Sequence, residues 1–426
     1  MFADLGLAIR SQRAGDVVLS RPLFLLHGWL DLWHALPGVS GTRAEPPAIH
    51  PLGMGVIRHL ACAARPARMA GQRRQSAGRL LATVATREPM TTGVRYSPAM
   101  SNRSVKAGVS LAAVMAHCGG SPVGAVKILA GSIASAPTAP EPYAALAELW
   151  QERRSELEEG LAEDRSLSAV LAQAYFFFLD GNVDDAVMAL GSVTGVRPDV
   201  AWAAAPWFGE ARFVGAVSAA AMAEACLRTL DYGHDLDSDA MRERFAPWLH
   251  AIDAVSERDP VPESLAAMAR LPRALGRHDL SFALCDRADA VEPVMWTAVA
   301  RAATWRVMGD LDQTAAAFES AVRLDPANWS LYLDLADVRA EQGDFAAAVG
   351  LTAQGLEHEP REVTLRAANA AYRTRLSGSP DDLKALITLA PDVTNGSYRN
   401  LLIDYACAGP KLSRELVEEA HRMRNG

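Results

Sequence analysis

Apolar side chains recur with the period of an α-helix along the chain from about residue 105 onward. One helical stripe, spaced i, i+3, i+4 and i+7, is formed by Tyr332, Leu335, Ala336 and Arg339. The same spacing recurs in Tyr143, Leu146, Ala147 and Trp150. Four positions on one helical face predict a packed helix in both places.

Glycine and proline punctuate these helices at a constant interval. Gly309 and Pro326 are 17 positions apart, and Gly343 and Pro360 repeat both residues 34 positions later. The interval of 17 also joins Gly120 to Pro137, Gly181 to Pro198 and Gly276 to Pro293. Five occurrences of one spacing indicate an internal repeat.

Each interval predicts the end of one helix and the whole of the next. Glycine tolerates the left-handed conformation that ends a helix, and proline marks the turn after a second helix. Alanine stands five positions after three of the glycines, at Ala125, Ala186 and Ala348. Small side chains at these positions let two helices approach closely. We therefore expect helical hairpins with an alanine-rich second helix.

These residues resemble the tetratricopeptide repeat. The best copy runs from Gly309 to Pro326, with Phe318 and Ala321 in register and Trp305 at the preceding aromatic position. The resemblance implies an all-α fold, a right-handed α-solenoid of helix-turn-helix hairpins. A single hairpin cannot bury its apolar face, so stacked copies must share one core.

The resemblance covers residues 100–410, and it is best over about residues 167–200 and 295–362. The departures are Thr314 in place of an alanine, Pro272 inside a first helix, a charged run at 152–164 in place of a regular second helix, and a poor fit over 230–262. We expect residues 411–426 to form a capping helix.

Residues 1–99 differ in composition from the rest. They hold twelve arginines, no lysine and five acids, a net charge of +7, whereas the remainder has 30 basic and 45 acidic residues, a net charge of −15. Proline, glycine and arginine recur there without a helical period, so we expect a poorly structured segment. A basic arm for nucleic acid is one interpretation. We favour an inert tail or upstream sequence translated from an early start codon.

The composition also indicates the cellular compartment of the protein. Half of the 426 residues are hydrophobic and only 7% are aromatic, which suits packed helices. The five cysteines are far apart and odd in number, which argues against a disulfide framework and for the cytoplasm. No apolar run reaches the roughly 18 residues that a membrane-spanning helix needs. The alanine- and arginine-rich composition is typical of a bacterial genome of high GC content.

The sequence contains no motif that carries a known chemistry. Phosphate-binding and dinucleotide-binding glycine patterns are absent, as are zinc-ligand spacings. Residues 235–239 begin like a calcium loop, but Ala240 and Ala246 replace its glycine and its last glutamate, which favours an acidic linker or a helix cap. We therefore expect no catalytic activity, no cofactor and no metal. An enzyme with its active site in residues 230–262 is the competing interpretation.

The resemblance also implies a binding surface on the first helix of each hairpin. In the family, the second, fifth, ninth, twelfth and thirteenth positions of that helix line a groove. Transferred onto this chain, the aromatic and charged candidates are Tyr175, Phe178, Trp202, Arg212, Phe213, Trp296, Arg306 and Asp337. The ninth positions, which hold Tyr175, Gly209, Ala303 and Asp337, lack the asparagine and lysine that a carboxylate clamp needs.

Aromatic side chains and arginines are good interface anchors, so these candidates predict binding of a peptide or helix of another protein. On this interpretation, Trp202→Ala or Trp296→Ala weakens binding without unfolding the chain, and Asp337→Ala is thermally neutral. The competing interpretation is that residues 175–178 and 202–207 simply pack between repeats.

The sequence thus predicts a non-catalytic protein-interaction scaffold or adaptor in the cytoplasm. We expect a protein or peptide partner, no nucleic acid and no membrane, and self-association stays open. The alternative is the sensor or regulatory part of a bacterial transcriptional or signalling system. That alternative requires a DNA-binding domain, and residues 1–99 show no helix-turn-helix pattern.

Overall fold

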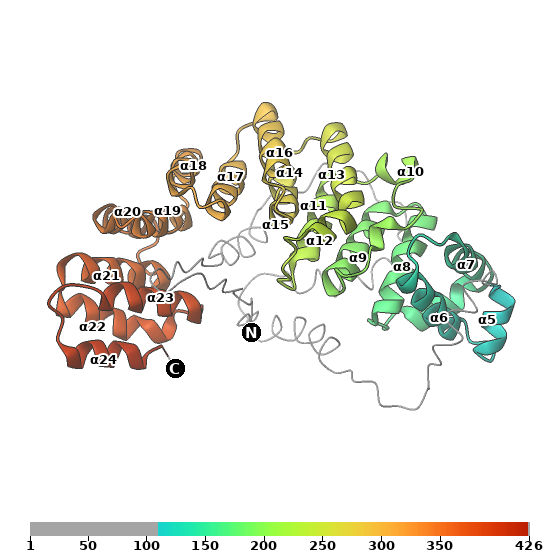
Figure 1. Ribbon diagram of the computed structural model, residues 1–426, viewed down its shortest axis with the longest axis horizontal. Coiled ribbons are helices and arrows are strands. Elements are labelled where there is room, and N and C mark those ends of the chain that lie inside the picture. Colours follow the sequence, from blue (N-terminus) through green and yellow to red (C-terminus); the bar gives the residue numbers. More distant parts are fainter. Residues whose placement is uncertain (1–109, 425–426) are drawn as a thin grey trace. The chain divides into compact units, whose positions relative to one another are not determined.

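The structure is a computed structural model that describes residues 110–424. Every regular element in this range is helical, and the range contains no β-strand (Figure 1). The predicted all-α fold of helical hairpins is therefore confirmed. The expectations for residues 1–99 fall outside the described range. Contacts divide the described residues into an N-terminal unit, residues 110–280, and a C-terminal unit, residues 281–424.

The N-terminal unit combines hairpins with shorter helices. Its elements are α5 (Leu111–His117), α6 (Pro122–Ser135), α7 (Pro140–Leu161), α8 (Leu167–Leu179), α9 (Val183–Val196), η2 (Trp202–Ala204), α10 (Ala211–Val214), α11 (Ala219–Leu230), α12 (Asp239–Arg244), α13 (Ala246–Arg258), α14 (Pro262–Met268) and α15 (Arg270–Ala274). Helix α8 packs on α9, and α9 packs on α11. These three helices form the most regular part of the unit.

Two glycines set the close packing of α9 on α11. A Cβ atom at Gly195 would lie 2.3 Å from the carbonyl oxygen of Arg228, and one at Gly191 would lie 2.6 Å from that of Ala225. Such distances are too short for any real Cβ contact. Only glycine at both positions lets the two helix backbones meet here.

Residues 199–217 do not form the first helix that the repeat spacing predicts. Only the 3-10 turn η2 and the single helical turn α10 form in this segment. Pro206 lies in the middle of the expected helix, where it removes a backbone donor and clashes with the preceding turn. Gly209 lowers the helix propensity further. We call residues 199–217 the irregular segment.

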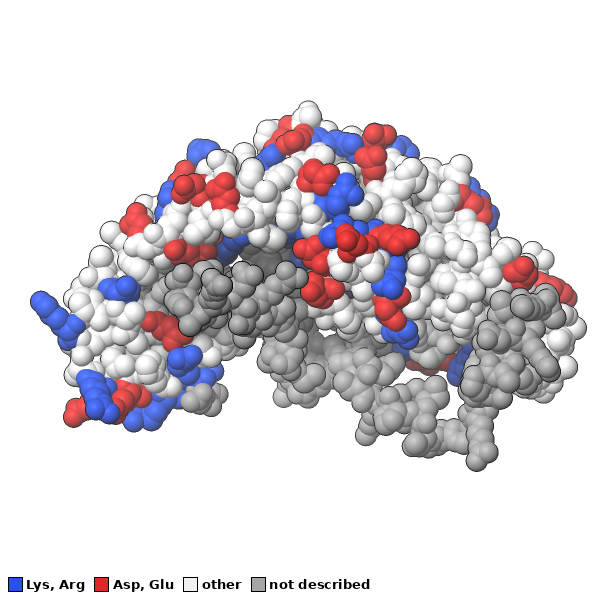
Figure 2. Space-filling view, in the orientation of Figure 1, with Lys and Arg blue, Asp and Glu red and all other residues white. Residues whose placement is uncertain are grey.

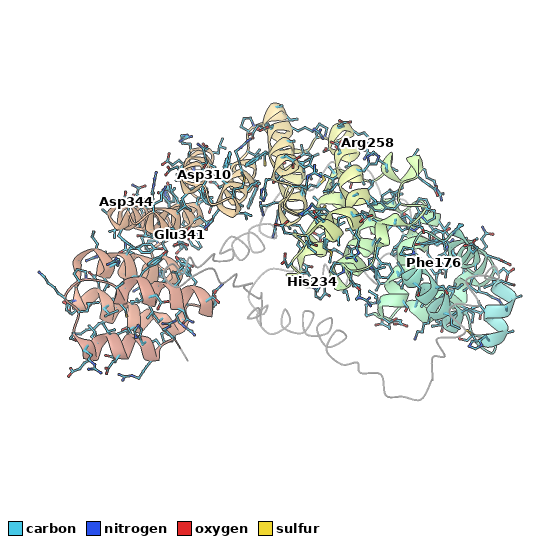
Figure 3. The ribbon with its side chains drawn as sticks, viewed as in Figure 1. Phe176, His234, Arg258, Asp310, Glu341 and Asp344 are labelled. Atoms are coloured by element: carbon cyan, nitrogen blue, oxygen red, sulfur yellow. The ribbon has the colours of Figure 1, made fainter. Side chains whose placement is uncertain are left out.

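Side chains from neighbouring helices hold the end of the irregular segment. Arg258, labelled in Figure 3, donates hydrogen bonds to the carbonyl oxygens of Val214 and Val217. Asp184 accepts hydrogen bonds from the backbone amide and the hydroxyl of Ser218, both at 2.8 Å. Backbone groups that no regular helix pairs are satisfied in this way.

The C-terminal unit is a regular series of antiparallel helices. Its elements are α16 (His278–Val291), which begins at the boundary between the units, α17 (Met295–Val307), α18 (Leu311–Leu324), α19 (Trp329–Glu341), α20 (Phe345–His358), α21 (Val363–Ser377), α22 (Pro380–Leu389), η3 (Ala390–Asp392), α23 (Gly396–Cys407) and α24 (Arg414–Arg422). Each helix from α17 to α22 packs against the next one in sequence. The hairpins α17–α18 and α19–α20 are the clearest copies of the repeat.

The five predicted helix-ending glycines all adopt the left-handed conformation. Their φ angles are +82° at Gly120, +80° at Gly181, +69° at Gly276, +80° at Gly309 and +83° at Gly343. Residues with a Cβ atom are strained at such angles, so glycine ends each of these helices. The three alanines, Ala125, Ala186 and Ala348, have no exposed surface. Both predictions are confirmed.

An aspartate directly after the glycine starts the second helix in two consecutive copies. Asp310 accepts a hydrogen bond from the amide of Gln313 at 3.0 Å, and Asp344 accepts one from the amide of Ala347 at 2.9 Å. Both aspartates are labelled in Figure 3. These caps satisfy amides that the first helical turn leaves free. The repeat therefore carries its own start signal as well as its stop signal.

The departures from the repeat pattern form helices of unusual length. The charged run at 152–164 continues α7 as far as Leu161, with a break in the helical angles at Arg153. Pro272 lies inside the short helix α15, directly after α14. At the other end of the chain, α24 packs against α22 and α23. The helix expected within residues 411–426 therefore forms.

Candidate partner-binding surfaces

Tyr175 and Phe178 belong to an aromatic cluster in the N-terminal unit. Phe178 is 1% exposed, and its ring centroid lies 5.0 Å from that of Trp207 in the irregular segment. Tyr175 is half-buried, and its ring lies 5.2 Å from that of Tyr143. The cluster joins α7, α8 and the irregular segment. Tyr175 therefore belongs to the cluster but remains partly exposed to solvent.

Arg212 is the exposed charged residue beside this cluster. Its guanidinium carbon lies 3.8 Å from the ring centroid of Phe178, and its Nε donates a hydrogen bond to Glu210 at 2.8 Å. The attraction between a cation and an aromatic face holds the guanidinium in place, while its edge keeps donors for further acceptors. Burial and the charge of Glu210 raise the pKa of Tyr175, which keeps the phenol protonated.

Trp202 and Phe213 are core residues, and the expectation that a partner reaches them is wrong. Trp202 is 2% exposed, and its indole N–H donates a hydrogen bond to the carbonyl oxygen of Arg197 at 2.8 Å. Phe213 has no exposed surface, and its ring lies 4.8 Å from that of Phe208. The irregular segment turns both side chains inward because no first helix forms to display them.

Trp296 and Asp337 of the C-terminal unit are also buried, with 7% and 3% exposure. Asp337 accepts hydrogen bonds from the hydroxyl groups of Tyr372 and Tyr398, the second at 2.8 Å. The three residues lie on α19, α21 and α23, so one carboxylate joins three helices. The expectation that Asp337 is an accessible contact is wrong.

Arg306 extends this polar network to α17. Its Nη2 donates to the carboxylate of Glu341, labelled in Figure 3, while its Nη1 is buried without a partner. Burial raises the pKa of Asp337 to about 6, and burial together with Asp337 raises the pKa of Asp334 to about 7. The positive charge of Arg306 opposes both increases. Arg306 therefore serves as the internal counter-charge of the network.

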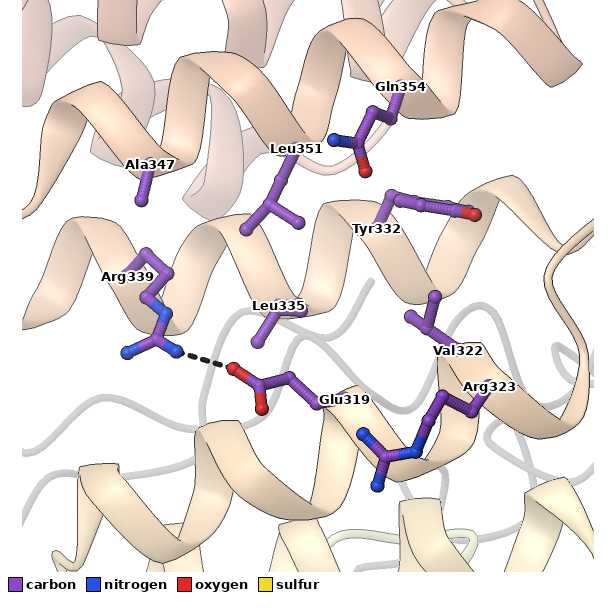
Figure 4. Close-up of a pocket in the computed structure, with 9 residues that line it drawn as sticks. All are labelled: Glu319, Val322, Arg323, Tyr332, Leu335, Arg339, Ala347, Leu351 and Gln354. Carbon is purple, nitrogen blue, oxygen red and sulfur yellow. Dashed lines mark hydrogen bonds and ion pairs between the residues drawn. The ribbon is translucent and has the colours of Figure 1, made fainter.

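A surface hollow of about 420 Å³ lies between α18, α19 and α20 (Figure 4). Its α18 and α19 sides consist of Glu319, Val322, Arg323, Tyr332, Leu335 and Arg339. Its α20 side consists of Ala347, Leu351 and Gln354. Figure 4 shows Leu335 and Leu351 near the centre, with the charged side chains of α18 and α19 around them. The hollow is thus apolar at its centre and charged at its rim.

The aromatic position of the repeat differs between this hollow and the preceding copy. Trp305 occupies the aromatic position of that copy, and its ring lies 4.5 Å from that of Phe282. Thirty-four positions later the residue is Arg339, which pairs with Glu319 at 2.6 Å. An arginine that reaches across to α18 leaves space that an indole would fill. Sequence reasoning missed this site, although arginine at an aromatic position was the available signal.

Helix α19 separates the hollow from the Asp337 network. Each residue turns an α-helix by about 100°, so Leu335 and Asp337 differ in direction by about 200°. The hollow and the predicted first-helix surface therefore lie on opposite sides of one helix.

Charged residues of both signs are interspersed on the face drawn in Figure 2. Asp237 and Asp239 both pair with Arg242, the second at 2.8 Å, and Ser238 accepts a hydrogen bond from the amide of Met241. This arrangement agrees with the helix-cap interpretation of residues 235–239. Within residues 110–424, no three potential metal ligands gather into one group.

No individual helix in the described part of the chain combines the length and the apolar character needed to cross a membrane. Helices α5 and α6 have the required length and apolar character only when they are counted together, and they are bent by 118° at the break between them.

Comparison with solved structures finds chains that are similar to this one. A tetratricopeptide repeat protein from Parabacteroides merdae ATCC 43184 is 14% identical, with coverage of 73% of this chain and 95% of its own, and a TM-score of 0.30. The APC/C hetero-tetramer Cut9-Hcn1 is 10% identical over 87% of this chain, with a TM-score of 0.27, and the match spans 62% of that chain. The search of curated protein sequences found no match.

The family model for the tetratricopeptide repeat matches residues 308–368. This range contains α18, α19, α20 and the beginning of α21. It also contains Gly309 and Gly343, with their left-handed angles, and the two aspartate caps that follow them. The helix ends, the caps and the spacing of 34 residues agree with the match, so residues 308–368 form tetratricopeptide repeats.

Proposed function

We propose that the chain is a protein-interaction scaffold that binds a segment of another protein beside α8 of its N-terminal unit. The observation that carries the proposal is the exposed guanidinium of Arg212, held on the ring of Phe178 next to half-buried Tyr175. The family supports the general function, because tetratricopeptide repeats generally bind proteins.

The chemistry of this surface favours a peptide with both apolar and acceptor groups. Tyr175 offers an aromatic edge and a phenol that stays protonated, and Arg212 offers guanidinium donors. Tyrosine and arginine are enriched among residues that dominate binding energy at interfaces. Glu210 already neutralises part of the positive charge, since it pairs with Arg212 at 2.8 Å. We therefore expect main-chain carbonyls or a single carboxylate as acceptors, rather than an acidic tract.

The proposal includes no catalytic step and no cofactor, and it places the scaffold in a reducing compartment such as the cytoplasm. Support for the compartment comes from four cysteines with free thiols, Cys118, Cys226, Cys285 and Cys407. Free thiols are the state expected where disulfides do not persist.

Arg212→Ala tests the proposal directly. The immobilised full chain captures proteins from native lysate, and quantitative mass spectrometry compares the recovery by parent and variant. Arg197→Ala is the matched control, because Arg197 also pairs with an acid two positions away, Asp199, at 2.7 Å, and lacks the contact with Phe178. We expect partner binding to weaken by about 2 kcal/mol with Arg212→Ala and to persist with the control.

Both variants should melt like the parent, since exposed ion pairs contribute little to stability. Equal recovery of every captured protein by the parent, Arg212→Ala and Tyr175→Ala, with all three folded, would overturn the proposed surface.

A further inference from the structure

We propose that the hollow between α18, α19 and α20 is a second docking site. Its occupant is a segment of a partner protein that inserts one apolar side chain and presents a carboxylate beside it. The inference rests on the proposed scaffold function, but it concerns the other unit and a different side of the first helix.

The hollow has room for a large apolar side chain, and its lining suits one. Its volume of about 420 Å³ lies within the roughly 300–1,000 Å³ typical of ligand pockets. Leu335 is 3% exposed and forms part of the floor, while Val322 and Leu351 are half-buried at the sides. An apolar side chain placed among them removes their remaining surface from water, which is the main driving force for association.

The charges at the rim select an acidic partner. Arg339 is already paired with Glu319 at 2.6 Å. Arg323 is exposed and donates to the hydroxyl of Ser320 at 2.7 Å, but it contacts no carboxylate among residues 110–424. The rim therefore carries one uncompensated positive charge. Complementary charge steers an acidic segment to this site and disfavours a basic one.

The preceding copy of the repeat lacks the features of this site. There, the ring of Trp305 packs against Phe282, and Arg301 pairs with Asp286 at 2.8 Å and with Asp289 at 2.6 Å. Arg301 and the ring of Trp305 therefore both have partners within the fold. The partner segment consequently has one anchor at the hollow, rather than a series of equivalent anchors along the helices.

A library of random peptides about 12 residues long, displayed on phage and selected against the full chain, tests the inference. The enriched peptides should combine a large apolar residue with a nearby aspartate or glutamate. Their affinities are then measured as synthetic peptides against the parent and four variants of the full chain, each checked by a thermal melt.

Two variants alter the hollow and two are matched controls. Ala347→Phe fills the hollow from α20, and Ala346→Phe places the same ring at the exposed neighbouring position. Arg323→Glu reverses the uncompensated charge, and Arg361→Glu makes the same change at an exposed arginine outside the hollow. We expect Ala347→Phe and Arg323→Glu to weaken binding about tenfold or more, and the controls to leave it unchanged. Arg323 is exposed, so Arg323→Glu should stay folded. It therefore tests the docking site even if Ala347→Phe unfolds the chain.

Three results would overturn the inference: no enriched peptide, enrichment of basic peptides, or peptides that bind Arg323→Glu as tightly as the parent. A parent dimer that Arg323→Glu dissociates would show that a second copy of the chain is the occupant instead. Arg212→Ala separates the two proposals in the same assay. Peptides lost with Arg212→Ala and retained with Arg323→Glu would support the surface near α8 and reject the hollow.

Discussion

The two units keep the same helix-ending glycines but differ in what stands between them. In the C-terminal unit, Gly309 and Gly343 are each followed by a capped second helix, and the first helices α17 and α19 both have 13 residues. In the N-terminal unit, Gly181 is followed by α9, but the next first helix is replaced by the irregular segment. A glycine cap is a local requirement of the backbone, so it persists where the neighbouring helix does not.

The units also join their helices by different means. The N-terminal unit uses rings, with Phe178, Trp207 and Phe213 packed within 6.3 Å of one another by ring centroid. The C-terminal unit uses a buried carboxylate, Asp337, between two tyrosine hydroxyls. Aromatic residues at groove positions of a repeat therefore do not by themselves mark a binding surface, because a disrupted repeat buries them.

Trp202→Ala should give the largest effect and would sharpen the contrast between the units. Removing a buried indole leaves a cavity and takes one of two hydrogen-bond donors from the carbonyl oxygen of Arg197, so we expect a loss of about 3–5 kcal/mol in the free energy of unfolding. Denaturant titration followed by circular dichroism measures it. A loss below about 1 kcal/mol would show that the irregular segment contributes no core.

Asp337→Ala tests the buried carboxylate that joins three helices of the C-terminal unit. The hydroxyl groups of Tyr372 and Tyr398 lose their acceptor inside the fold, and we expect a loss of about 2–4 kcal/mol. Asp337→Asn keeps an acceptor oxygen and should lose less. If both variants unfold at the parent's denaturant midpoint, the carboxylate does not hold the three helices together.

Ala186→Leu and Ala348→Leu test what the units share. Both alanines have no exposed surface at the crossing of two helices, so a larger side chain should cost about 1–3 kcal/mol in either unit. Ala346→Leu, at an exposed position of α20, is the control and should stay within about 0.5 kcal/mol of the parent. Thermal melts compare the three. A neutral result at one buried alanine alone would mean that the units differ in hairpin packing too.

Asp334→Asn tests a contribution to stability that depends on pH. The pKa of Asp334 is raised to about 7 in the folded chain, against about 3.9 when unfolded. Between these values the folded chain holds a proton that the unfolded chain has lost, so stability falls as pH rises. The variant lacks this loss, so it should match the parent near pH 4 and exceed it at pH 8 by up to about 4 kcal/mol, the equivalent of a shift of about three pKa units.

Melting temperatures of parent and variant across this range give the comparison. Parallel curves, or an advantage of the variant that shrinks as pH rises, would contradict the assignment of a raised pKa to Asp334.

The sequence was sufficient for the hairpin ends and for much of the core. Gly309 and Gly343 had to be glycine, and Ala186 and Ala348 had to be small, because each requirement is local or depends on one neighbouring helix. Local sequence also favoured an acidic linker or a helix cap at residues 235–239, and Ser238 caps the helix there. Periodic signals of this kind need no knowledge of the tertiary fold.

The candidate site was harder to predict because it depends on which repeats are intact. Trp202 and Phe213 were assigned to a helix that Pro206 prevents from forming. Asp337 was assigned to an open surface, although Tyr372 and Tyr398, 35 and 61 positions later, bury it. The hollow lies beside Arg339, which stands where the preceding copy has Trp305.

Hydroxyl-radical footprinting of the full chain tests most directly the central claim that the predicted groove tryptophans are core and that partners must bind elsewhere. Met308, 49% exposed, and Met268, with no exposed surface, set the fast and slow limits of oxidation within one sample. The account predicts that Trp202 and Trp296 react near the slow limit, once rates are corrected with the denatured chain, and that half-buried Tyr175 reacts faster. Tryptophans that oxidise as readily as Met308 would contradict it.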